Sequence, residues 1–264
     1  MTTLRVLLHV AAQRDYELHS LDFSTAFLQG SLHEEIWLCR PPGFTGSFPP
    51  GTQWSLRRPV YGLRQAPREW HDTLRTTLAA LGFAPSTADP SLFLRTDTSL
   101  PPFYVLVYVD DLVFATADTA GLAHVKSFST STSRTPRLRP LLYLLATRSQ
   151  LTGLADASWA DDQATQRSSE GYTFSLGSGS VSWRATRSSS VLGSSCEAEI
   201  YSGAMAAQEL LWLTYLLTDL GEPPRSPPVL YVDNKAMLAL CREQRLEHRT
   251  KHIALRYFLA CELQ

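Results

Sequence analysis

Two adjacent aspartates, Asp110 and Asp111, lie inside one of the most apolar stretches of the 264-residue chain, between residues 103 and 115. Side by side in such surroundings, two carboxylates repel each other and are costly to take out of water. They are tolerated if they stay in a solvated turn or if they share a bound cation. The pair is therefore interpreted either as a surface turn or as part of a metal site.

The residues on both sides of the pair predict the element that carries it. Residues 104–108 and 112–116 are short apolar runs of strand type, separated by an acidic break. This pattern predicts a tight β-hairpin with the aspartates at its tip. Because aspartate is a common turn residue, the segment alone does not decide between the two interpretations.

Another isolated aspartate, Asp22, ends a strand-like run and is followed by an apolar segment that Gly30 closes. Three further blocks follow in order, at residues 36–44, 60–70 and 108–111. Their order and spacing resemble the palm of a copia-type retrotransposon reverse transcriptase. The resemblance covers residues from about 3 to 117 and implies an α+β palm, an antiparallel sheet backed by helices.

By this resemblance, Asp22 and Asp110 are metal ligands and Asp111 is the third catalytic carboxylate, at the primer end. Nucleotidyl transfer uses two divalent ions that shared carboxylates hold about 3.5–4 Å apart, and oxygen ligands suit Mg²⁺ or Mn²⁺. The resemblance also places Phe27 under the sugar, where it excludes a 2′-hydroxyl, and Gln65 against the incoming nucleotide. On the residues alone, Phe27 equally fits a core position and Gln65 a surface position.

The second half of the chain carries its own acidic residues. Its pattern predicts a strand ending near Asp156, an antiparallel hairpin over residues 171–184, a long helix from Cys196, a strand over 229–233 and two further helices. This βββαβαα order resembles the RNase H domain of the same family, an α/β domain with a mixed sheet. The blocks at 194–199, 231–234 and 248–253 carry the resemblance.

The long helix offers two glutamates near its start. Ser194 and Glu197 form a capping box, in which the hydroxyl accepts an amide of the first turn and the carboxylate reaches back to the amide of Ser194. Glu199 lies roughly 200° further round the helix and falls where the family has its catalytic glutamate. Asp156, Glu199 and Asp233 are therefore expected to hold Mg²⁺, which activates water to cut the RNA strand of an RNA–DNA hybrid.

Two positions depart from the RNase H pattern. Ser158 stands where the family usually has a second aspartate, at a position expected to be peripheral. Ala254 stands where an aspartate commonly follows Lys-His-Ile as a fourth ligand. We expect cleavage to be weakened unless Asp161, Asp162 or another acid substitutes.

The length of the chain limits the polymerase activity that the first resemblance implies. The expected domains are a palm with incomplete fingers at 1–117, a linker with the remnant of a deleted thumb and connection at 118–150, and an RNase H-like domain at 151–264. Residues 127–140 are rich in Ser and Thr, basic and interrupted by proline, as is typical of a flexible linker. A large internal deletion, or an intron wrongly assigned in the gene, is the simplest interpretation, and polymerisation is expected to be impaired.

The charge balance also argues for caution about nucleic-acid binding. The net charge is −1 and the sequence pI is about 6.7, whereas strong duplex binding relies on Lys and Arg side chains that neutralise phosphates. Local basic patches lie beside each expected site and fit either backbone contact or a solvated helix face. They are Arg57, Arg58, Arg64 and Arg68, and then Arg242, Arg245, Arg249, Lys251 and Arg256.

Other signals exclude functions. The four cysteines have no zinc-site spacing, and His248 and His252 lack a third ligand nearby, so no zinc site is expected. Residues 4–12 are apolar but interrupted by Arg5, which favours a helix over a signal peptide. No apolar run reaches the length of a membrane span. The expected location is therefore intracellular, in the cytoplasm or nucleus, without a membrane partner.

The leading hypothesis is an RNA-directed DNA polymerase and RNase H of a copia-type retrotransposon, in the form of a fragment with impaired polymerisation. Its implied partners are an RNA template, a DNA primer, an RNA–DNA hybrid and dNTPs, while the sequence does not indicate an oligomeric state. Two alternatives stay open. One is a nuclease that cuts hybrids alone, and the other is a catalytically dead relic that binds nucleic acid or protein.

Overall fold

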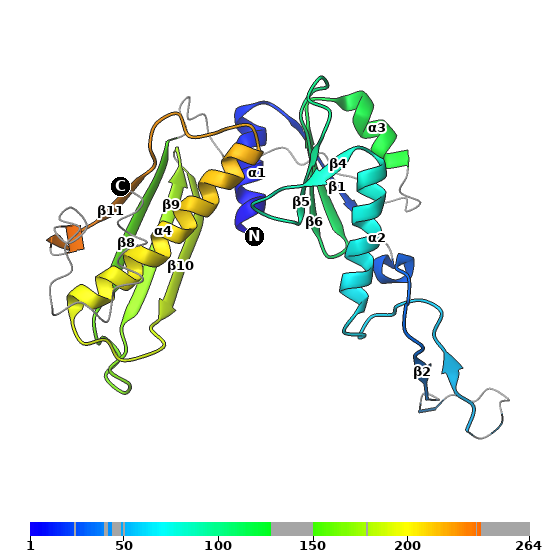
Figure 1. The fold of residues 1–264 in the computed structure, drawn as a ribbon, viewed down its shortest axis with the longest axis horizontal. Coiled ribbons are helices and arrows are strands. Elements are labelled where there is room, and N and C mark those ends of the chain that lie inside the picture. The colour runs from blue at the N-terminus through cyan, green and yellow to red at the C-terminus, as the bar shows by residue number, and fades with distance from the viewer. Residues whose placement is uncertain are drawn as a thin grey trace. The chain divides into compact units, whose positions relative to one another are not determined.

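The computed structural model describes residues 1–127 and 150–238, with short gaps at 24, 40–41, 44–48, 50, 178 and 236. By its contacts the chain divides into two compact units, which are described separately (Figure 1). The antiparallel-sheet unit comprises Glu17–Pro85 and Pro90–Arg139. The mixed-sheet unit comprises Met1–Tyr16, Ser86–Asp89 and Pro140–Gln264.

The antiparallel-sheet unit is built on five strands in the order β1-β7-β6-β5-β4, and every neighbouring pair is antiparallel. The strands are β1 (Glu17–Asp22), β4 (Phe83–Pro85), β5 (Leu92–Arg95), β6 (Phe103–Tyr108) and β7 (Asp111–Thr116). A separate ribbon pairs β2 (Trp37–Leu38) with β3 (Trp54–Ser55). The antiparallel sheet expected for this half is confirmed.

Helices bury one side of this sheet. They are α2 (Ala66–Ala80), α3 (Thr119–Ser127) and the short 3-10 helix η1 (Ala26–Gln29). Trp70, Leu74 and Leu78 recur every four residues on one face of α2, and all three enter the same core as Phe93 and Phe103. In β6 the first five residues are all buried, as in a strand with both faces covered. The core therefore lies directly behind the hairpin that carries the adjacent aspartates.

The mixed-sheet unit contains four strands in the order β10-β9-β8-β11. Three are antiparallel neighbours, while β11 runs parallel to β8. The elements are β8 (Leu151–Ser158), β9 (Ser169–Leu176), β10 (Gly179–Arg187), α4 (Ser195–Asp219) and β11 (Val229–Val232). Parallel neighbours need a crossover connection, and α4 supplies it by lying across the sheet (Figure 1). The expected mixed sheet is confirmed, while the helices expected after it lie outside the described residues.

Helix α1 (Thr2–Gln13) belongs to the mixed-sheet unit by its contacts. The guanidinium of Arg5 lies 3.8 Å from the ring centroid of Trp183 on β10, close enough for a cation–π contact. Arg14, just after the helix, forms an ion pair with Glu222. The two compact units therefore differ in membership from the sequence stretches expected as domains. None of the described helices is long and apolar enough to cross a membrane.

The segment Ser86–Asp89 also belongs to the mixed-sheet unit. The carboxylate of Asp219, at the end of α4, accepts hydrogen bonds from the Ser86 hydroxyl at 2.5 Å and from the Thr87 amide at 2.9 Å. The indole N–H of Trp212 donates to the carbonyl of Ala88 at 2.8 Å. Helix α4 thus holds this segment at two places, through the carboxylate of Asp219 and through the indole of Trp212.

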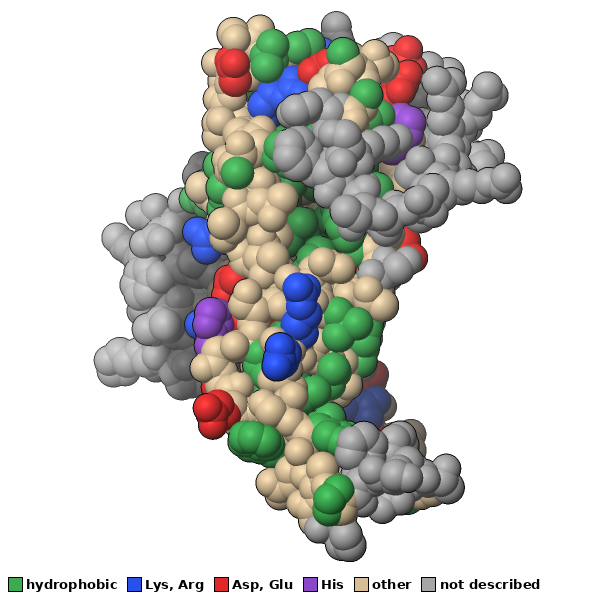
Figure 2. Space-filling view, turned by 90° about the vertical axis from the view of Figure 1, so that its right-hand side faces the viewer, with side chains coloured by type: hydrophobic (Ala, Val, Ile, Leu, Met, Phe, Trp, Pro, Cys, Tyr) green, Lys and Arg blue, Asp and Glu red, His purple; other side chains and the backbone are tan. Residues whose placement is uncertain are grey.

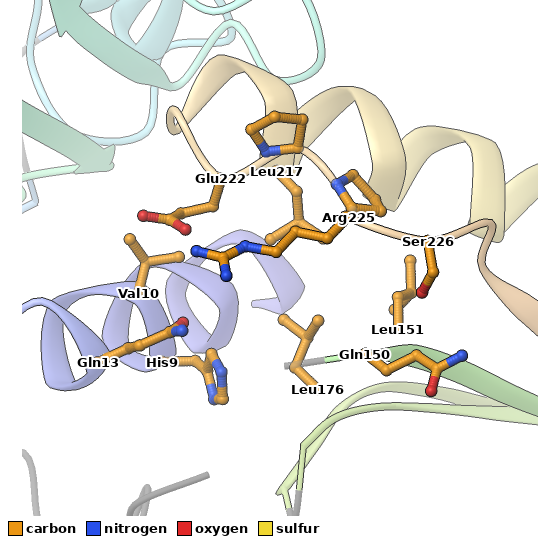
Figure 3. A pocket seen from close by; sticks show the side chains of 12 residues that line it. His9, Val10, Gln13, Gln150, Leu151, Leu176, Leu217, Glu222, Arg225 and Ser226 are labelled. Carbon is orange, nitrogen blue, oxygen red and sulfur yellow. The ribbon is translucent and has the colours of Figure 1, made fainter. Parts of the chain in front are cut away.

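A pocket of about 390 Å³ lies between α1, the ends of β8 and β9 and the loop after α4 (Figure 3). Val10, Leu151 and Leu176 give it apolar walls, and the guanidinium of Arg225 extends along it. Burial lowers the pKa of His9, which also lines it. None of the carboxylates expected to do chemistry lines this pocket, so the candidate sites lie elsewhere.

Candidate metal-dependent active sites

The aspartate pair lies at a hairpin, as the sequence predicts, but the turn begins one residue earlier than expected. Strands β6 and β7 are joined by Val109 and Asp110, while Asp111 is already the first residue of β7 and pairs with Tyr108. Val109 has φ = 57°. A two-residue hairpin turn commonly needs positive φ at its first position, where glycine is preferred. A β-branched residue there is strained.

Asp22 meets this hairpin from the neighbouring strand. It is the last residue of β1 and is the register partner of Asp111 on β7. The amide of Phe23 donates to the carbonyl of Asp110 at 2.9 Å, which ties the end of β1 to the turn. Burial raises the pKa of Asp111, and the charges of Asp110 and Asp22 raise it further. The structure therefore brings the three predicted aspartates into electrostatic contact.

Sequence reasoning assigned no role to Trp70, although it ends one of the blocks that carry the resemblance. Its indole N–H donates to the carbonyl of Val109 at 2.6 Å. Its ring packs edge-on against Phe23, with the centroids 5.1 Å apart. The residues around Trp70 give no local signal for such a bond, because the partner is 39 residues away in sequence.

The two predicted nucleotide contacts lie in the same unit. Phe27 is 7% exposed, belongs to the core and has its ring centroid 4.4 Å from that of the exposed Tyr61. Gln65 is the residue before α2, and its side-chain amide donates to Glu34 at 3.4 Å. Phe27 therefore fits a core position and Gln65 a surface position as well as they fit nucleotide contacts. The nucleotide contacts stay predictions.

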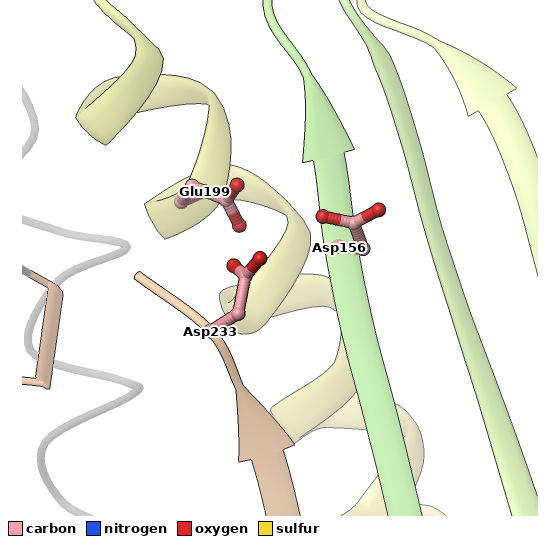
Figure 4. A group of neighbouring side chains, drawn as sticks. All are labelled: Asp156, Glu199 and Asp233. Carbon is pink, nitrogen blue, oxygen red and sulfur yellow. The ribbon is translucent and has the colours of Figure 1, made fainter. Parts of the chain in front are cut away.

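The second predicted cluster is brought together from three elements. Asp156 comes from β8, Glu199 from α4 and Asp233 from the end of β11, and their carboxylates face one another (Figure 4). One oxygen from each lies within 4.8 Å of the others. In the part of the chain that the structure describes, no other group of three His, Cys, Asp or Glu side chains meets this test.

The backbone around this cluster is fixed by hydrogen bonds to α4. The hydroxyl of Ser202, one helical turn after Glu199, lies 2.8 Å from the carbonyl of Asp156 and 2.9 Å from that of Gly171. After β11, the side chain of Asn234 accepts the amide of Met237 at 2.9 Å, which starts a new turn directly behind Asp233. The backbone at Asp156 and the turn that follows Asp233 are thus held by neighbouring polar residues.

The start of α4 follows the predicted capping box with one difference. Ser194 Oγ accepts the amide of Glu197 at 3.1 Å, as expected. The carboxylate of Glu197, however, accepts the amide of Gly193 at 2.7 Å, one residue before the amide predicted from the sequence. Glu197 keeps a structural role, which leaves Glu199 for the cluster.

The electrostatics of Glu199 fit a cation. Its side chain is buried, and its Oε2 atom has no hydrogen-bond partner among the described residues. Burial, then the charges of Asp233 and Asp156, raise the pKa of Glu199 to about 7. Three converging carboxylates, one with a buried and unsatisfied oxygen, form the oxygen-rich environment that Mg²⁺ or Mn²⁺ prefers.

Asp161 and Asp162, the two acids named as possible substitutes for a fourth ligand, bind other side chains. Asp161 accepts the hydroxyl of Ser169 at 2.7 Å. Asp162 forms an ion pair with Arg187 at 2.7 Å. Hydrogen bonds from Thr165 and Ala164, together with the charge of Arg187, lower the pKa of Asp162 although burial raises it. Ala254, His248 and His252 lie outside the described residues.

The four arginines of the predicted basic patch in the antiparallel-sheet unit have separate surroundings. Arg57, Arg58, Arg64 and Arg68 are all exposed. Arg58 donates to the carbonyl of Leu28 at 2.9 Å, and Arg68 lies 3.8 Å from Asp72. On the face drawn in Figure 2, Lys and Arg side chains of the described residues form small separate groups. The predicted C-terminal patch lies outside the described residues.

A five-stranded antiparallel sheet with one aspartate at the end of β1 and two more at the adjoining hairpin defines a palm-type polymerase domain. The family model for reverse transcriptase (RNA-dependent DNA polymerase) matches residues 1–141, more than half of the 264 residues. The chain belongs to this family. The copia-type resemblance inferred from the sequence is confirmed by the relatives that follow.

The relatives described here are proteins of transposons, two of them retrovirus-related Pol polyproteins. The chain is 29% identical to the retrovirus-related Pol polyprotein from transposon RE2 of Arabidopsis thaliana, over 97% of this chain and 26% of that protein. It is 24% identical to that from transposon TNT 1-94 of Nicotiana tabacum, over 97% of this chain and 29% of that protein. The putative transposon Ty5-1 protein YCL074W of Saccharomyces cerevisiae is 40% identical over 95 residues, 36% of this chain and 30% of that protein.

The chain spans about a quarter of the length of the long polyproteins that it matches. The alignment with the RE2 protein extends over 373 positions, although this chain has 264 residues, so more than a hundred positions within it have no residue here. The crystal structure of RNase H1 from Halobacterium salinarum NRC-1 is similar at 13% identity and a TM-score of 0.31, covering 43% of this chain and 76% of that one.

Proposed function

We propose that this chain is a metal-dependent nucleic-acid enzyme of the copia-type reverse transcriptase family in which the RNase H-like site is the more complete of its two sites. The observation that carries the proposal is the convergence of Asp156, Glu199 and Asp233, with the Oε2 atom of Glu199 buried and unsatisfied. Its reaction would be hydrolysis of the RNA strand in an RNA–DNA hybrid.

Each residue has a distinct part in this proposal. Asp156 and Asp233 are exposed, so they would reach the scissile phosphate through shared cations, while Glu199 would close the site from the buried side. A bound Mg²⁺ or Mn²⁺ pair supplies an activated water and neutralises the charge that develops on the leaving oxygen. Ser202 holds the backbone of Asp156 in register with α4.

The polymerase half has its aspartates, but other features argue against efficient synthesis. More than a hundred positions of the aligned relatives have no residue in this chain. Asp22, Asp110 and Asp111 lie at one end of the sheet, but among the described residues only Asp156, Glu199 and Asp233 bring one ligand oxygen each within 4.8 Å of the others. We propose that template-directed extension by this chain is slow or absent, and that its partners are an RNA–DNA hybrid and, more weakly, a primed template with dNTPs.

The test uses the full chain and a labelled RNA–DNA hybrid with Mg²⁺ and, separately, Mn²⁺. Wild-type protein should cut the RNA strand, and EDTA or Asp156→Asn should stop the cutting. Glu209→Gln changes a residue on the same helix but outside the cluster, and it should leave cleavage of the RNA strand unchanged. A hybrid that stays intact with wild-type protein in both metals would contradict the nuclease proposal.

A second assay separates the remaining possibilities. Extension of a primed RNA template at the rate of an intact reverse transcriptase would contradict impaired polymerisation. Calorimetric titration with Mn²⁺ that detects no binding at either set of carboxylates would favour a catalytically dead relic over both enzymes.

A further inference from the structure

The hairpin that carries Asp110 and Asp111 adopts a conformation that its own sequence disfavours. Val109 has φ = 57°, in the left-handed region, where a β-branched side chain is an outlier. The side chain of Val109 is 49% exposed, so burial of this residue does not compensate for the strain. A strained backbone of this kind persists only where surrounding contacts hold it.

Two hydrogen bonds hold the turn, one on each of its carbonyl groups. The indole N–H of Trp70 donates to the carbonyl of Val109 at 2.6 Å, and the amide of Phe23 donates to the carbonyl of Asp110 at 2.9 Å. These donors come from α2 and from the end of β1, which are far apart in sequence. The turn is therefore held by donors from outside the hairpin in addition to the pairing of Tyr108 with Asp111.

The two donors also support each other. The rings of Trp70 and Phe23 pack edge-on with centroids 5.1 Å apart, and Trp70 is 4% exposed within the core of the unit. A buried indole has few alternative orientations, so its N–H stays directed at the turn. Because Phe23 directly follows Asp22, this ring pair links the position of Asp22 to that of the Asp110–Asp111 turn.

From this geometry we infer that Trp70 is a positioning residue for the polymerase carboxylates: its indole N–H keeps Val109 in the left-handed conformation and so sets Asp110 and Asp111 against Asp22. The inference rests on the proposed assignment of these three aspartates to metal binding. Partners that orient ligands from outside typically change metal affinity by about 10–100-fold when removed.

The experiment measures Mn²⁺ binding to the full chain by electron paramagnetic resonance. All proteins carry Asp156→Asn and Glu199→Gln, which remove the second cluster, and Asp110→Asn then identifies the signal of the palm site. Trp70→Phe keeps an aromatic ring but loses the N–H, and it should weaken Mn²⁺ binding about tenfold. The matched control is Trp212→Phe, which loses an equivalent indole bond to the Ala88 carbonyl in the other unit and should leave binding unchanged.

A double-mutant cycle with Val109→Gly tests the cause. Glycine adopts positive φ without strain, so Trp70→Phe should weaken Mn²⁺ binding less than about threefold in the Val109→Gly protein. An undiminished tenfold loss there would overturn the proposed link to backbone strain. Equal binding by parent and Trp70→Phe, or an equal loss in Trp212→Phe, would overturn the positioning role.

Hydrogen exchange gives a readout that does not depend on metal. The Phe23 amide is protected by the Asp110 carbonyl, so Trp70→Phe should speed its exchange about tenfold while amides of β4 and β5 keep their rates. If the parent binds no Mn²⁺ at the palm site, the proposed function of that site fails, and the exchange rate of Phe23 still decides whether Trp70 holds the turn. An unchanged exchange rate of the Phe23 amide in Trp70→Phe would refute the claim that Trp70 holds the turn.

Discussion

Asp22 and Asp111 face each other directly across β1 and β7, as register partners at the end of an antiparallel pair. Like charges at opposed positions of a sheet destabilise it. Burial and the charges of Asp110 and Asp22 keep the pKa of Asp111 above its usual range. The sheet therefore carries a local repulsion that a cation between the strands would relieve.

Replacing Asp111 with Asn should stabilise the protein when metal is absent. One of the opposed charges is then gone, and we expect the melting temperature in EDTA at pH 7 to rise by about 2–4 °C. Because the pKa of Asp111 is raised in the folded state, the gain should disappear below the ordinary aspartate pKa, where Asp111 is protonated in both states. Asp97→Asn is the control, since Asp97 accepts two bonds from Ser99 and should lose stability instead. A fall in melting temperature for Asp111→Asn would contradict the repulsion.

The stability of the metal-free protein should depend on the proton of Glu199. Its folded pKa of about 7 exceeds the usual 4.5, so the folded state binds more protons between these values and stability falls as pH rises from about 4.5 to 7. Glu199→Gln should flatten that part of the curve in urea unfolding. Mn²⁺ binding should weaken as pH falls below 7, because the cation competes with this proton. If the two proteins have the same pH dependence, the buried carboxylate is not the cause.

The N-terminus of α4 offers a test of the helix that presents Glu199. Ser194→Ala removes the acceptor for the Glu197 amide and should cost about 1 kcal/mol of unfolding free energy. Ser195→Ala, one residue later, removes a hydroxyl that caps nothing in the described contacts and should change stability by less than half as much. Urea unfolding followed by circular dichroism measures both. Equal effects would mean that the cap contributes no specific stability.

Asp219 should stabilise the mixed-sheet unit through the segment Ser86–Asp89. Burial raises its pKa, but hydrogen bonds from Ser86, Ala88 and Thr87 outweigh burial and lower it overall. Asp219→Ala should therefore cost about 2 kcal/mol at pH 7, and the loss should shrink as pH falls through the folded pKa, where the native carboxylate is protonated too. Asp161→Ala is the comparison, because Asp161 accepts one described bond, from Ser169. A loss for Asp219→Ala no larger than for Asp161→Ala would count against the proposed anchor.

The sequence was sufficient for features that depend on local pattern. Short apolar runs predict the hairpin of β6 and β7, and aspartates at or near strand ends predict both acidic sets. Asp156 lies on β8 and Asp233 directly after β11, and these two strands are parallel neighbours. These conclusions hold because a strand or a cap is encoded within a few residues.

Other features depend on contacts between distant segments and could not be predicted from the sequence. The bond from Trp70 to Val109 and the capture of Ser86 by Asp219 join residues 39 and 133 positions apart. The choice of the Gly193 amide by Glu197 depends on how the chain enters α4. Nothing in the local pattern of these residues distinguishes such partners from solvent.

The crossover that places β11 beside β8 also brings together carboxylates that are far apart in sequence. Asp156 on β8 and Asp233 directly after β11 are separated in sequence by the whole of β9, β10 and α4. Contacts between such distant segments close large loops and form late in folding. Cation binding by Asp156, Glu199 and Asp233 would therefore report that this topology is complete.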